Sequence, residues 1–313
     1  MSNPSAAAVA VIDIGSNSIK SLVARRATDG GLTIVRTQTL DARISAGISG
    51  PVPRLAEAGM VRGVEAVVTL LAGAAEFSPR QIACVATSAV RDAVNGAEFC
   101  ARVLAATGHS VRILTGAEEA NGIGRGLTAD PALSSLQDFY VFDLGGGSLE
   151  CLAFRGRQVG QAVSLPLGCV RLTERLVPDP TQPLAADLPA QVAALTRTEL
   201  ARARFTFSLA PGTVAVGSGG TVATVRAILG ARQGLEFGLT SPVVDVAAVH
   251  ELYAWISALP LSERRGIAGL PAARADVFPV ALATLLAVAE LGGFAALRNS
   301  GYNLRYGLAD ALL

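Results

Sequence analysis

The stretch Val11-Ile12-Asp13-Ile14-Gly15-Ser16-Asn17-Ser18 returns in altered form 130 residues later as Val141-Phe142-Asp143-Leu144-Gly145-Gly146-Gly147-Ser148. Each copy is a short apolar run followed by an aspartate and a turn of glycine and serine. A spacing of this size is that of a domain, far beyond the short periods of solenoids and propellers. The sequence therefore predicts two related α/β halves, each with an acid and a Gly-rich turn at the end of a strand.

The two turns indicate a particular chemistry. Gly-rich turns after a strand expose backbone N–H groups, which suit phosphate oxygens. An aspartate beside bound phosphate usually acts through a divalent cation, because it would otherwise repel the anion. One such turn can also be a plain turn capped by its aspartate. The recurrence, together with the helix-opening turn Gly217-Ser218-Gly219-Gly220-Thr221, favours a phosphate-handling protein, although none of the three matches a P-loop or a dinucleotide fingerprint.

Composition narrows the class of protein. A length of 313 residues suits two domains, and 51% hydrophobic residues are ample for two cores. The net charge of +1 argues against a general nucleic-acid binder, and Lys20 is the only lysine, so an anion clamp must consist mostly of arginine. Four widely separated cysteines give no zinc or disulfide framework and fit a cytoplasmic protein. No signal peptide or membrane-spanning segment is recognised, so no membrane partner is expected.

Periodicity predicts the order of elements. The first half should contain strands at 8–14, 18–25, 32–39, 81–86 and 110–114, helices at 55–76 and 92–107, and a helix that Thr115 and Glu118 cap and that runs to about Leu127. The second half should contain strands starting at 139, 150, 160 and 213, a helix over 190–207 and a mostly helical stretch over 246–313. We place the two domains at 1–128 and 129–313, with a C-terminal helix at about 302–313 that could pack back on the first domain.

Several side chains near these turns are candidates with ordinary alternatives. Glu118 and Glu119 follow Thr115 at capping-box spacing, where acids also favour the helix dipole. Arg91 at a strand-to-helix junction is either a phosphate contact or a solvated surface residue. Glu150 lies two residues after Ser148, so both can share one face of a strand, or Glu150 is simply exposed.

The chain offers no familiar nucleophile or histidine base. His109 and His250 are its only histidines and lie far in sequence from the glycine turns. We therefore expect water to attack directly, with a carboxylate to orient it and a metal ion to neutralise the developing charge.

Six segments together carry a family resemblance. They are Asp13-Ile14-Gly15-Ser16-Asn17-Ser18, Ala86-Thr87-Ser88-Ala89-Val90-Arg91-Asp92-Ala93, Thr115-Gly116-Ala117-Glu118-Glu119-Ala120, Phe142-Asp143-Leu144-Gly145-Gly146-Gly147-Ser148-Leu149-Glu150, Leu167-Gly168-Cys169-Val170-Arg171-Leu172 and Gly217-Ser218-Gly219-Gly220-Thr221, with Arg274-Ala275-Asp276 as a weaker seventh. In this order they resemble the exopolyphosphatase/guanosine pentaphosphate phosphatase (Ppx/GppA) family of the actin-like ATPase superfamily.

The resemblance implies two ribonuclease-H-like domains with a phosphate-binding cleft between them. It implies that Glu119 orients or deprotonates the attacking water, and that Asp143 and Glu150 are catalytic carboxylates that also hold Mg²⁺ or Mn²⁺, with Asp13 as a further metal ligand. It places phosphate-binding positions on Asp13, Gly15, Ser16, Asn17, Ser18, Arg91, Gly145, Gly146, Gly147, Ser148, Gly219, Gly220 and Thr221.

The expected activity is hydrolysis of the terminal phosphate of inorganic polyphosphate. The alternatives are hydrolysis of guanosine pentaphosphate at the same site, a non-catalytic sensor of polyphosphate or alarmone, and a sugar or acetate kinase on the same fold. A homodimer is left open. Departures from the family pattern are Asn121 after the Glu-Glu-Ala motif and the stretch Asn303-Leu304-Arg305-Tyr306-Gly307, which lacks a glycine and an acid. Because longer relatives add helical C-terminal domains, a preference for short chains is expected.

Overall fold

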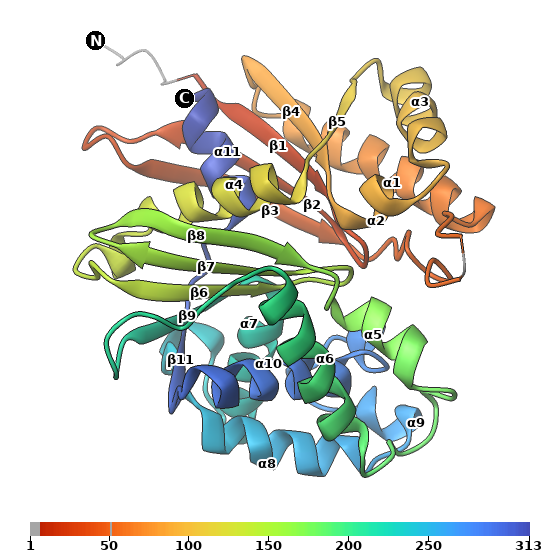
Figure 1. Ribbon diagram of the computed structural model, residues 1–313. Helices are drawn as coiled ribbons and strands as arrows, with labels where there is room; N and C mark the ends of the chain where they lie inside the picture. The colour runs from red at the N-terminus through yellow and green to blue at the C-terminus, as the bar shows by residue number, and fades with distance from the viewer. Residues whose placement is uncertain (1–6, 51) are drawn as a thin grey trace. The chain divides into compact units, whose positions relative to one another are not determined.

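The computed structural model describes residues 7–50 and 52–313, which divide into two compact units. Unit 1 combines Met1–Ser134 with Tyr302–Leu313, and unit 2 is Ser135–Gly301. The division therefore follows residue 134 rather than 128, and the last helix belongs with the first unit. In Figure 1 this helix, α11 (Leu304–Leu312), is drawn in blue against the red N-terminal strands that it contacts.

Unit 1 is built on a five-stranded sheet with the order β3-β2-β1-β4-β5. Its strands are β1 (Val9–Ile14), β2 (Ile19–Arg26), β3 (Leu32–Leu40), β4 (Gln81–Ala86) and β5 (Val111–Ile113). The first three form an antiparallel meander, whereas β4 runs parallel to β1 and β5 parallel to β4. The first Gly-rich turn follows β1, the central strand of this sheet.

Helices cover both faces of the unit 1 sheet. They are α1 (Glu57–Ala75), α2 (Ser88–Asp92), α3 (Gly96–Thr107), α4 (Gly116–Thr128) and α11. Ile12 and Ile14 pack into the cluster that contains residues of α1 and α3, whereas Val9 and Val11 pack against α11. Side chains alternate along a strand, so Asp13 lies on the face that α11 covers.

One described helix, α1, is long and apolar enough to cross a membrane by length and composition alone. The core helix of a folded domain meets the same criterion. Its buried residues, which include Val67 and Leu70, form a stripe that packs against β1, β2 and α3.

Unit 2 is built on a six-stranded sheet with the order β10-β11-β9-β6-β7-β8. Its strands are β6 (Phe139–Leu144), β7 (Leu149–Arg155), β8 (Gln158–Leu165), β9 (Val214–Ser218), β10 (Val243–Asp245) and β11 (Ala296–Asn299). Its helices are α5 (Cys169–Leu176), α6 (Leu188–Arg202), α7 (Gly219–Arg232), α8 (Val246–Ser257), α9 (Leu261–Arg264) and α10 (Phe278–Gly292). Like β1, β6 has an antiparallel neighbour, β7, and a parallel one, β9.

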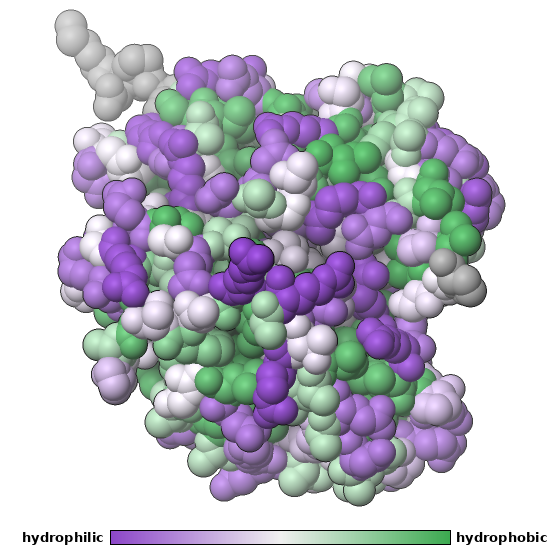
Figure 2. Space-filling model, in the orientation of Figure 1, coloured by the Kyte–Doolittle hydropathy of each residue, from purple (hydrophilic) through white to green (hydrophobic). Residues whose placement is uncertain are grey.

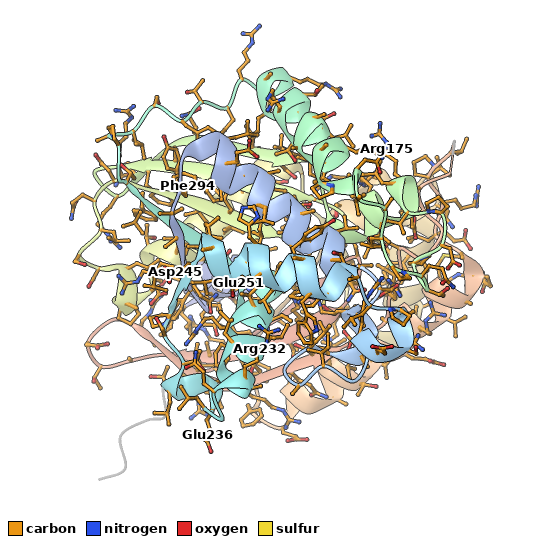
Figure 3. The ribbon with its side chains drawn as sticks, turned by 90° about the horizontal axis from the view of Figure 1, so that it is seen from below. Arg175, Arg232, Glu236, Asp245, Glu251 and Phe294 are labelled. Carbon is orange, nitrogen blue, oxygen red and sulfur yellow. The ribbon has the colours of Figure 1, made fainter. Side chains whose placement is uncertain are left out.

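The core of unit 2 centres on α10, which is buried from Phe278 to Ala289 and packs against α6 and α8. Figure 3 shows α8 and α10 side by side, with Phe294 just beyond α10. The Phe294 ring meets Tyr140 and Phe142 of β6 at centroid distances of 5.4 and 5.7 Å. This aromatic packing fixes β6, the strand that ends at Asp143. On the outside of the protein, hydrophilic and hydrophobic residues are interspersed over the face drawn in Figure 2.

Three element predictions are corrected. The helix expected over 92–107 begins only at Gly96, and Asp92 is instead the last residue of α2. Between the two helices the Asn95 side chain exchanges hydrogen bonds with the N–H and C=O of Leu55 at 2.8 and 3.0 Å and holds the chain in a break. The helix expected to reach 207 ends at Arg202, beyond which Arg204 adopts a positive φ of 56°. The region 246–313 contains β11, which starts after the left-handed cap Gly293 ends α10.

Candidate active site

A row of four polar side chains crosses the sheet of unit 2. Ser164 on β8 lies opposite Glu150 on β7, Glu150 opposite Asp143 on β6, and Asp143 beside Ser218 on β9. Residues in register on neighbouring strands share a face of the sheet. The Ser164 hydroxyl donates to Glu150 Oε1 at 2.7 Å, and the Ser218 hydroxyl donates to Asp143 Oδ2 at 2.6 Å. Two adjacent carboxylates are therefore oriented by a hydroxyl on either side.

The glycine loop after β6 is held by the first turn of α5. Gly145 O accepts a hydrogen bond from the Cys169 N–H at 3.0 Å, and Gly146 O accepts one from the Val170 N–H at 2.8 Å. Gly147 O accepts from Arg171 Nε at 2.9 Å. In a planar trans peptide the C=O and the N–H point in opposite directions. Because the loop carbonyls point at α5, the N–H groups that follow them point away from it, as phosphate binding requires.

The close packing of α5 against this loop leaves no room for a side chain at position 168. A Cβ added at Gly168 would lie 2.2 Å from Gly147 C and 2.3 Å from Ser148 N. Glycine at 168 thus allows α5 to approach the loop backbone closely.

The third Gly-rich turn starts α7 directly beside Asp143. Gly219 has a φ of +77°, and a Cβ there would lie 2.3 Å from Asp143 Oδ1. Thr221 Oγ1 donates to Leu144 O at 3.1 Å, which ties α7 to the end of β6. Arg274 donates to Gly220 O at 2.6 Å and to Thr221 Oγ1 at 3.1 Å. The two loops of unit 2 are therefore connected into one rigid hydrogen-bonded frame.

The corresponding row in unit 1 carries a different charge. Asp13 on β1 lies opposite Lys20 on β2, at the positions that Asp143 and Glu150 occupy in unit 2. Burial raises the pKa of Asp13, and the positive charges of Lys20 and Arg305 act to lower it. Asp13 thus has two positive charges of the protein near it.

The first turn is fixed by hydroxyl contacts. Ser16 Oγ lies 3.2 Å from Ser88 Oγ, and Ser45 Oγ donates to Ser16 O at 3.1 Å. A Cβ added at Gly15 would lie 2.9 Å from Ser18 O. Asn17 is 9% exposed, and its Oδ1 has no hydrogen-bond partner. Because buried polar groups are nearly always paired, this amide is a candidate for binding a ligand.

Glu118 and Glu119 have separate roles at the start of α4. Glu118 completes a capping box, in which its carboxylate accepts from the Thr115 N–H at 2.8 Å, and it also binds Arg112. The Thr115 backbone N–H, then Arg112 and the Thr115 hydroxyl, lower the pKa of Glu118 to about 2. Glu119 is 6% exposed, and its Oε2 accepts from Arg91 Nη1 at 2.9 Å. Helix capping therefore accounts for Glu118 and leaves Glu119 for another role.

The arginine that pairs with Glu119 is itself held in place. Arg91 sits in α2, at the junction that follows β4, and its Nη1 also donates to Leu114 O at 3.0 Å. Its side chain is only 22% exposed. The structure thus joins two candidate residues that lie 28 positions apart in the sequence.

Sequence reasoning gave no role to several supporting residues. They are Ser164, Gly168, Arg171, Ser218 and Arg274. Ser218 could have been found, since it precedes the glycines of a turn that was already recognised. Ser164 and Arg274 act across distant parts of the chain, and no local pattern marks such pairing.

The donor set bears on metal binding. Among residues 7–50 and 52–313 no group of three or more His, Cys, Asp and Glu residues could hold a metal ion. Mg²⁺, however, is usually held by one or two carboxylates, with water and substrate phosphate completing its shell. The adjacent carboxylates of Asp143 and Glu150 fit that pattern, whereas Asp13 faces Lys20.

Comparison with known proteins identifies the family. Residues 22–313 match the Ppx/GppA phosphatase family. The chain belongs to this family. The match covers both Gly-rich turns of unit 2 and the two helices, α2 and α4, that contain Arg91 and Glu119, so the chain is a phosphatase.

Solved structures agree on the fold. The Aquifex aeolicus PPX-GPPA enzyme is 25% identical, with a TM-score of 0.77 over 97% of this chain and 99% of its own. An exopolyphosphatase from Cytophaga hutchinsonii is 22% identical, with a TM-score of 0.86 over 97% of this chain and 98% of its own. These likenesses confirm the expected α/β architecture of two actin-like ATPase (ribonuclease-H-like) domains.

Proposed function

We propose that this Ppx/GppA phosphatase is a metal-dependent exopolyphosphatase that hydrolyses the terminal phosphoanhydride of inorganic polyphosphate, with a preference for short chains. The observation that carries the proposal is the pair of adjacent carboxylates, Asp143 and Glu150, bordered by two Gly-rich turns. Backbone N–H groups suit phosphate oxygens, and the carboxylates suit a divalent cation that neutralises them.

Glu119 is the proposed base. A buried carboxylate that accepts a hydrogen bond from Arg91 at 2.9 Å has a defined orientation, and a carboxylate can take a proton from water. In this mechanism Glu119 takes a proton from a water molecule while the oxygen of that water forms a bond to the terminal phosphorus. The bond to the bridging oxygen breaks, and the shortened chain leaves with the electron pair. Fixed geometry of this kind raises the rate because the reacting groups need little reorganisation.

Charge on the substrate is balanced by three kinds of group. The amides of Gly146, Gly147 and Ser148 offer donors, and Arg91 adds a cation beside Glu119. A divalent ion held by Asp143 and Glu150 would polarise the phosphoryl oxygens when bound. Asn17, in the turn after β1, would offer its side-chain Nδ2 as a further donor to a phosphate oxygen.

The expected preference for short chains is supported by the hydrogen bonds of three arginines. Arg274 makes hydrogen bonds to Gly220 and Thr221, Arg171 to Gly147, and Arg91 to Glu119. Cations that already bond to the protein's own acceptors add little for each further phosphate. We therefore expect affinity to depend on the first few phosphates.

The decisive experiment measures phosphate release from polyphosphates of defined length and from guanosine pentaphosphate side by side, with Mg²⁺ present. The proposal expects kcat/KM to reach its plateau at tripolyphosphate or slightly longer chains. A clear preference for guanosine pentaphosphate would assign the same site to the alarmone instead. Binding of both substrates without phosphate release would indicate a sensor. Glu119→Gln serves as the inactive control, so that contaminating phosphatases are recognised.

A further inference from the structure

The helix that carries Glu119 is shaped by its contact with α11. A Cβ added at Gly307 of α11 would lie 1.9 Å from Gly122 O of α4, and one at Gly126 would lie 2.2 Å from Asn303 O. A Cβ at Gly122 would meet Leu304 Cδ1 at 2.5 Å. The two helices therefore touch backbone to backbone. Glycines that weaken an isolated helix are required here by the close approach.

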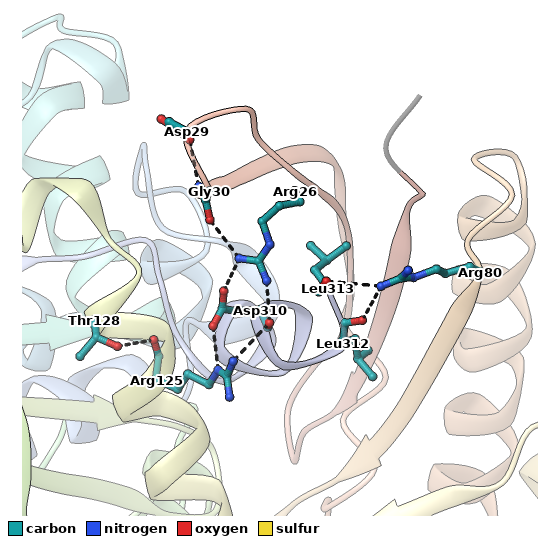
Figure 4. A network of polar contacts seen from close by, with 10 residues as sticks. Arg26, Asp29, Gly30, Arg80, Arg125, Thr128, Asp310, Leu312 and Leu313 are labelled. Atoms are coloured by element: carbon teal, nitrogen blue, oxygen red, sulfur yellow. Dashed lines mark hydrogen bonds and ion pairs between the residues drawn. The ribbon is translucent and has the colours of Figure 1, made fainter. Parts of the chain in front are cut away.

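A carboxylate on α11 fastens this crossing from the outside. Asp310 Oδ2 accepts from Arg125 Nε of α4 at 2.7 Å, and Asp310 Oδ1 accepts from Arg26 Nη1 of β2 at 2.6 Å. The backbone oxygen of Asp310 accepts from both arginines as well. Figure 4 shows Asp310 between Arg26 and Arg125. One side chain thus joins α11, α4 and the end of β2.

Glu119 lies on the same stripe of α4. It precedes Gly122 by three residues and Gly126 by seven, and residues at these spacings line up on one side of a helix. A helix with glycine at 122, 124 and 126 has little intrinsic rigidity, so its axis depends on what it packs against. Glu119 is thereby oriented at one end by Arg91 and along the helix by α11.

We propose that α11, fastened by Asp310, is a positioning element for Glu119, and that Asp310 acts on the reaction only through α4. The inference rests on the proposed role of Glu119 as the base. It adds a positioning role for Asp310, which lies on the last helix and makes its hydrogen bonds to Arg26 and Arg125 rather than to the Gly-rich turns or to Asp143 and Glu150.

The test compares Asp310→Ala with Glu76→Ala, a matched control that removes the exposed Arg36–Glu76 ion pair of the same unit. For Asp310→Ala, kcat should fall between about 3- and 100-fold with KM little changed, because small misplacements of a reacting group are costly in rate. Glu76→Ala should retain wild-type kcat. Asp310→Glu, which can reach the same two arginines, should restore most of the loss.

A double-mutant cycle separates positioning from general destabilisation. In the Glu119→Gln background, Asp310→Ala should have no further effect on kcat, because the group that it positions is gone. Equal losses of kcat in both backgrounds would overturn the proposal. The proposal would also be overturned if Asp310→Ala, made in the otherwise unchanged active enzyme, had the same kcat as the wild type.

A readout without turnover keeps the inference separate from the proposed function. Amide hydrogen exchange over residues 116–128 should accelerate in Asp310→Ala and not in Glu76→Ala, at a temperature where both variants are folded. Gly307→Ala should do the same through the crossing itself. If exchange accelerates but no phosphate is released by the wild type from any substrate, the proposed function fails. Unchanged exchange over 116–128 in both α11 variants would sink the inference about α11.

Discussion

Asp143 on β6 lies directly opposite Glu150 on β7, whereas the equivalent pair in unit 1 is Asp13 opposite Lys20. The two halves share a topology at this point, with an antiparallel and a parallel neighbour for the central strand. They differ in the charge of a single cross-strand partner. The acidic pair in unit 2 suits a divalent cation, whereas the pair in unit 1 sets a lysine opposite its acid.

The acidic pair leads to a prediction about metal. Hydrolysis should require Mg²⁺ or Mn²⁺, and Glu150→Gln should raise the Mg²⁺ concentration for half-maximal activity by at least about 10-fold. Titration of activity with EDTA measures the metal requirement, and titration with Mg²⁺ afterwards measures the concentration for half-maximal activity. Glu290→Gln, an exposed acid elsewhere in unit 2, is the control and should behave as wild type. Full activity in excess chelator would remove the metal from the proposal.

Removal of the proposed base should separate chemistry from binding. Glu119→Gln keeps the size of the side chain and its hydrogen-bond reach toward Arg91, but it cannot take a proton. We expect kcat to fall by roughly 10²–10⁴-fold, with substrate still bound. Single-turnover rates and equilibrium binding of a short polyphosphate provide the two measurements. A variant with near-normal kcat would exclude Glu119 from proton transfer.

Position 219, where α7 begins beside Asp143, should tolerate no side chain. Gly219→Ala must place a Cβ 2.3 Å from Asp143 Oδ1 at a φ of +77°. Strain of this kind costs about 1–3 kcal/mol, and the carboxylate must also move. We expect lower stability and a large loss of activity. Gly238→Ala, where an added Cβ meets nothing within 4 Å, is the control, and equal activity of the two variants would contradict the packing argument.

The sequence predicted the strands and turns well because their signals are local. Apolar runs that end in Asp and glycine placed β1 and β6 within about a residue, and Thr115 with Glu118 correctly placed the capping box. It could not predict that Asn95 breaks the helix at 92–96, since its partner Leu55 is 40 residues away. Nor could the sequence show that Arg91 bonds to Glu119, or that Gly122 and Gly126 allow α11 to pack closely against α4. These contacts join segments that are distant in sequence.

The Asp310 cluster gives a prediction about stability and pH. Burial alone would raise the pKa of Asp310, but hydrogen bonds from Arg26 and Arg125 outweigh it and lower the pKa below its usual value. An acid with a lowered folded pKa stabilises the fold above its unfolded pKa, and this contribution is lost as the pH falls through the folded value. Asp310→Asn should therefore cost about 1 kcal/mol at pH 7. Urea denaturation at pH 7, 5 and 3 should show the difference shrinking only below pH ~4, and a constant difference would refute the ion-pair explanation.

Dependence on chain length tests the proposed substrate most directly. Arg91, Arg171 and Arg274 already bond to groups of the protein, so these three cations should add little affinity for the distal phosphates of a long polyphosphate. We expect kcat/KM to rise over the first few phosphates and then to level off. Arg91→Ala should weaken binding of all lengths to a similar degree, because it acts near the terminal phosphate, and it should also lower kcat by releasing Glu119.

The measurement is kcat/KM from tripolyphosphate to chains of several hundred units, repeated at several salt concentrations. Screening by salt weakens each exposed ionic contact, so the salt slope reports how many such contacts a substrate makes. A slope that stays constant beyond the first few phosphates supports the short site. If kcat/KM and the salt slope continue to rise with length, further cations must bind the distal phosphates, and the exposed arginines of unit 2, such as Arg197 and Arg202 on α6, become the first residues to substitute.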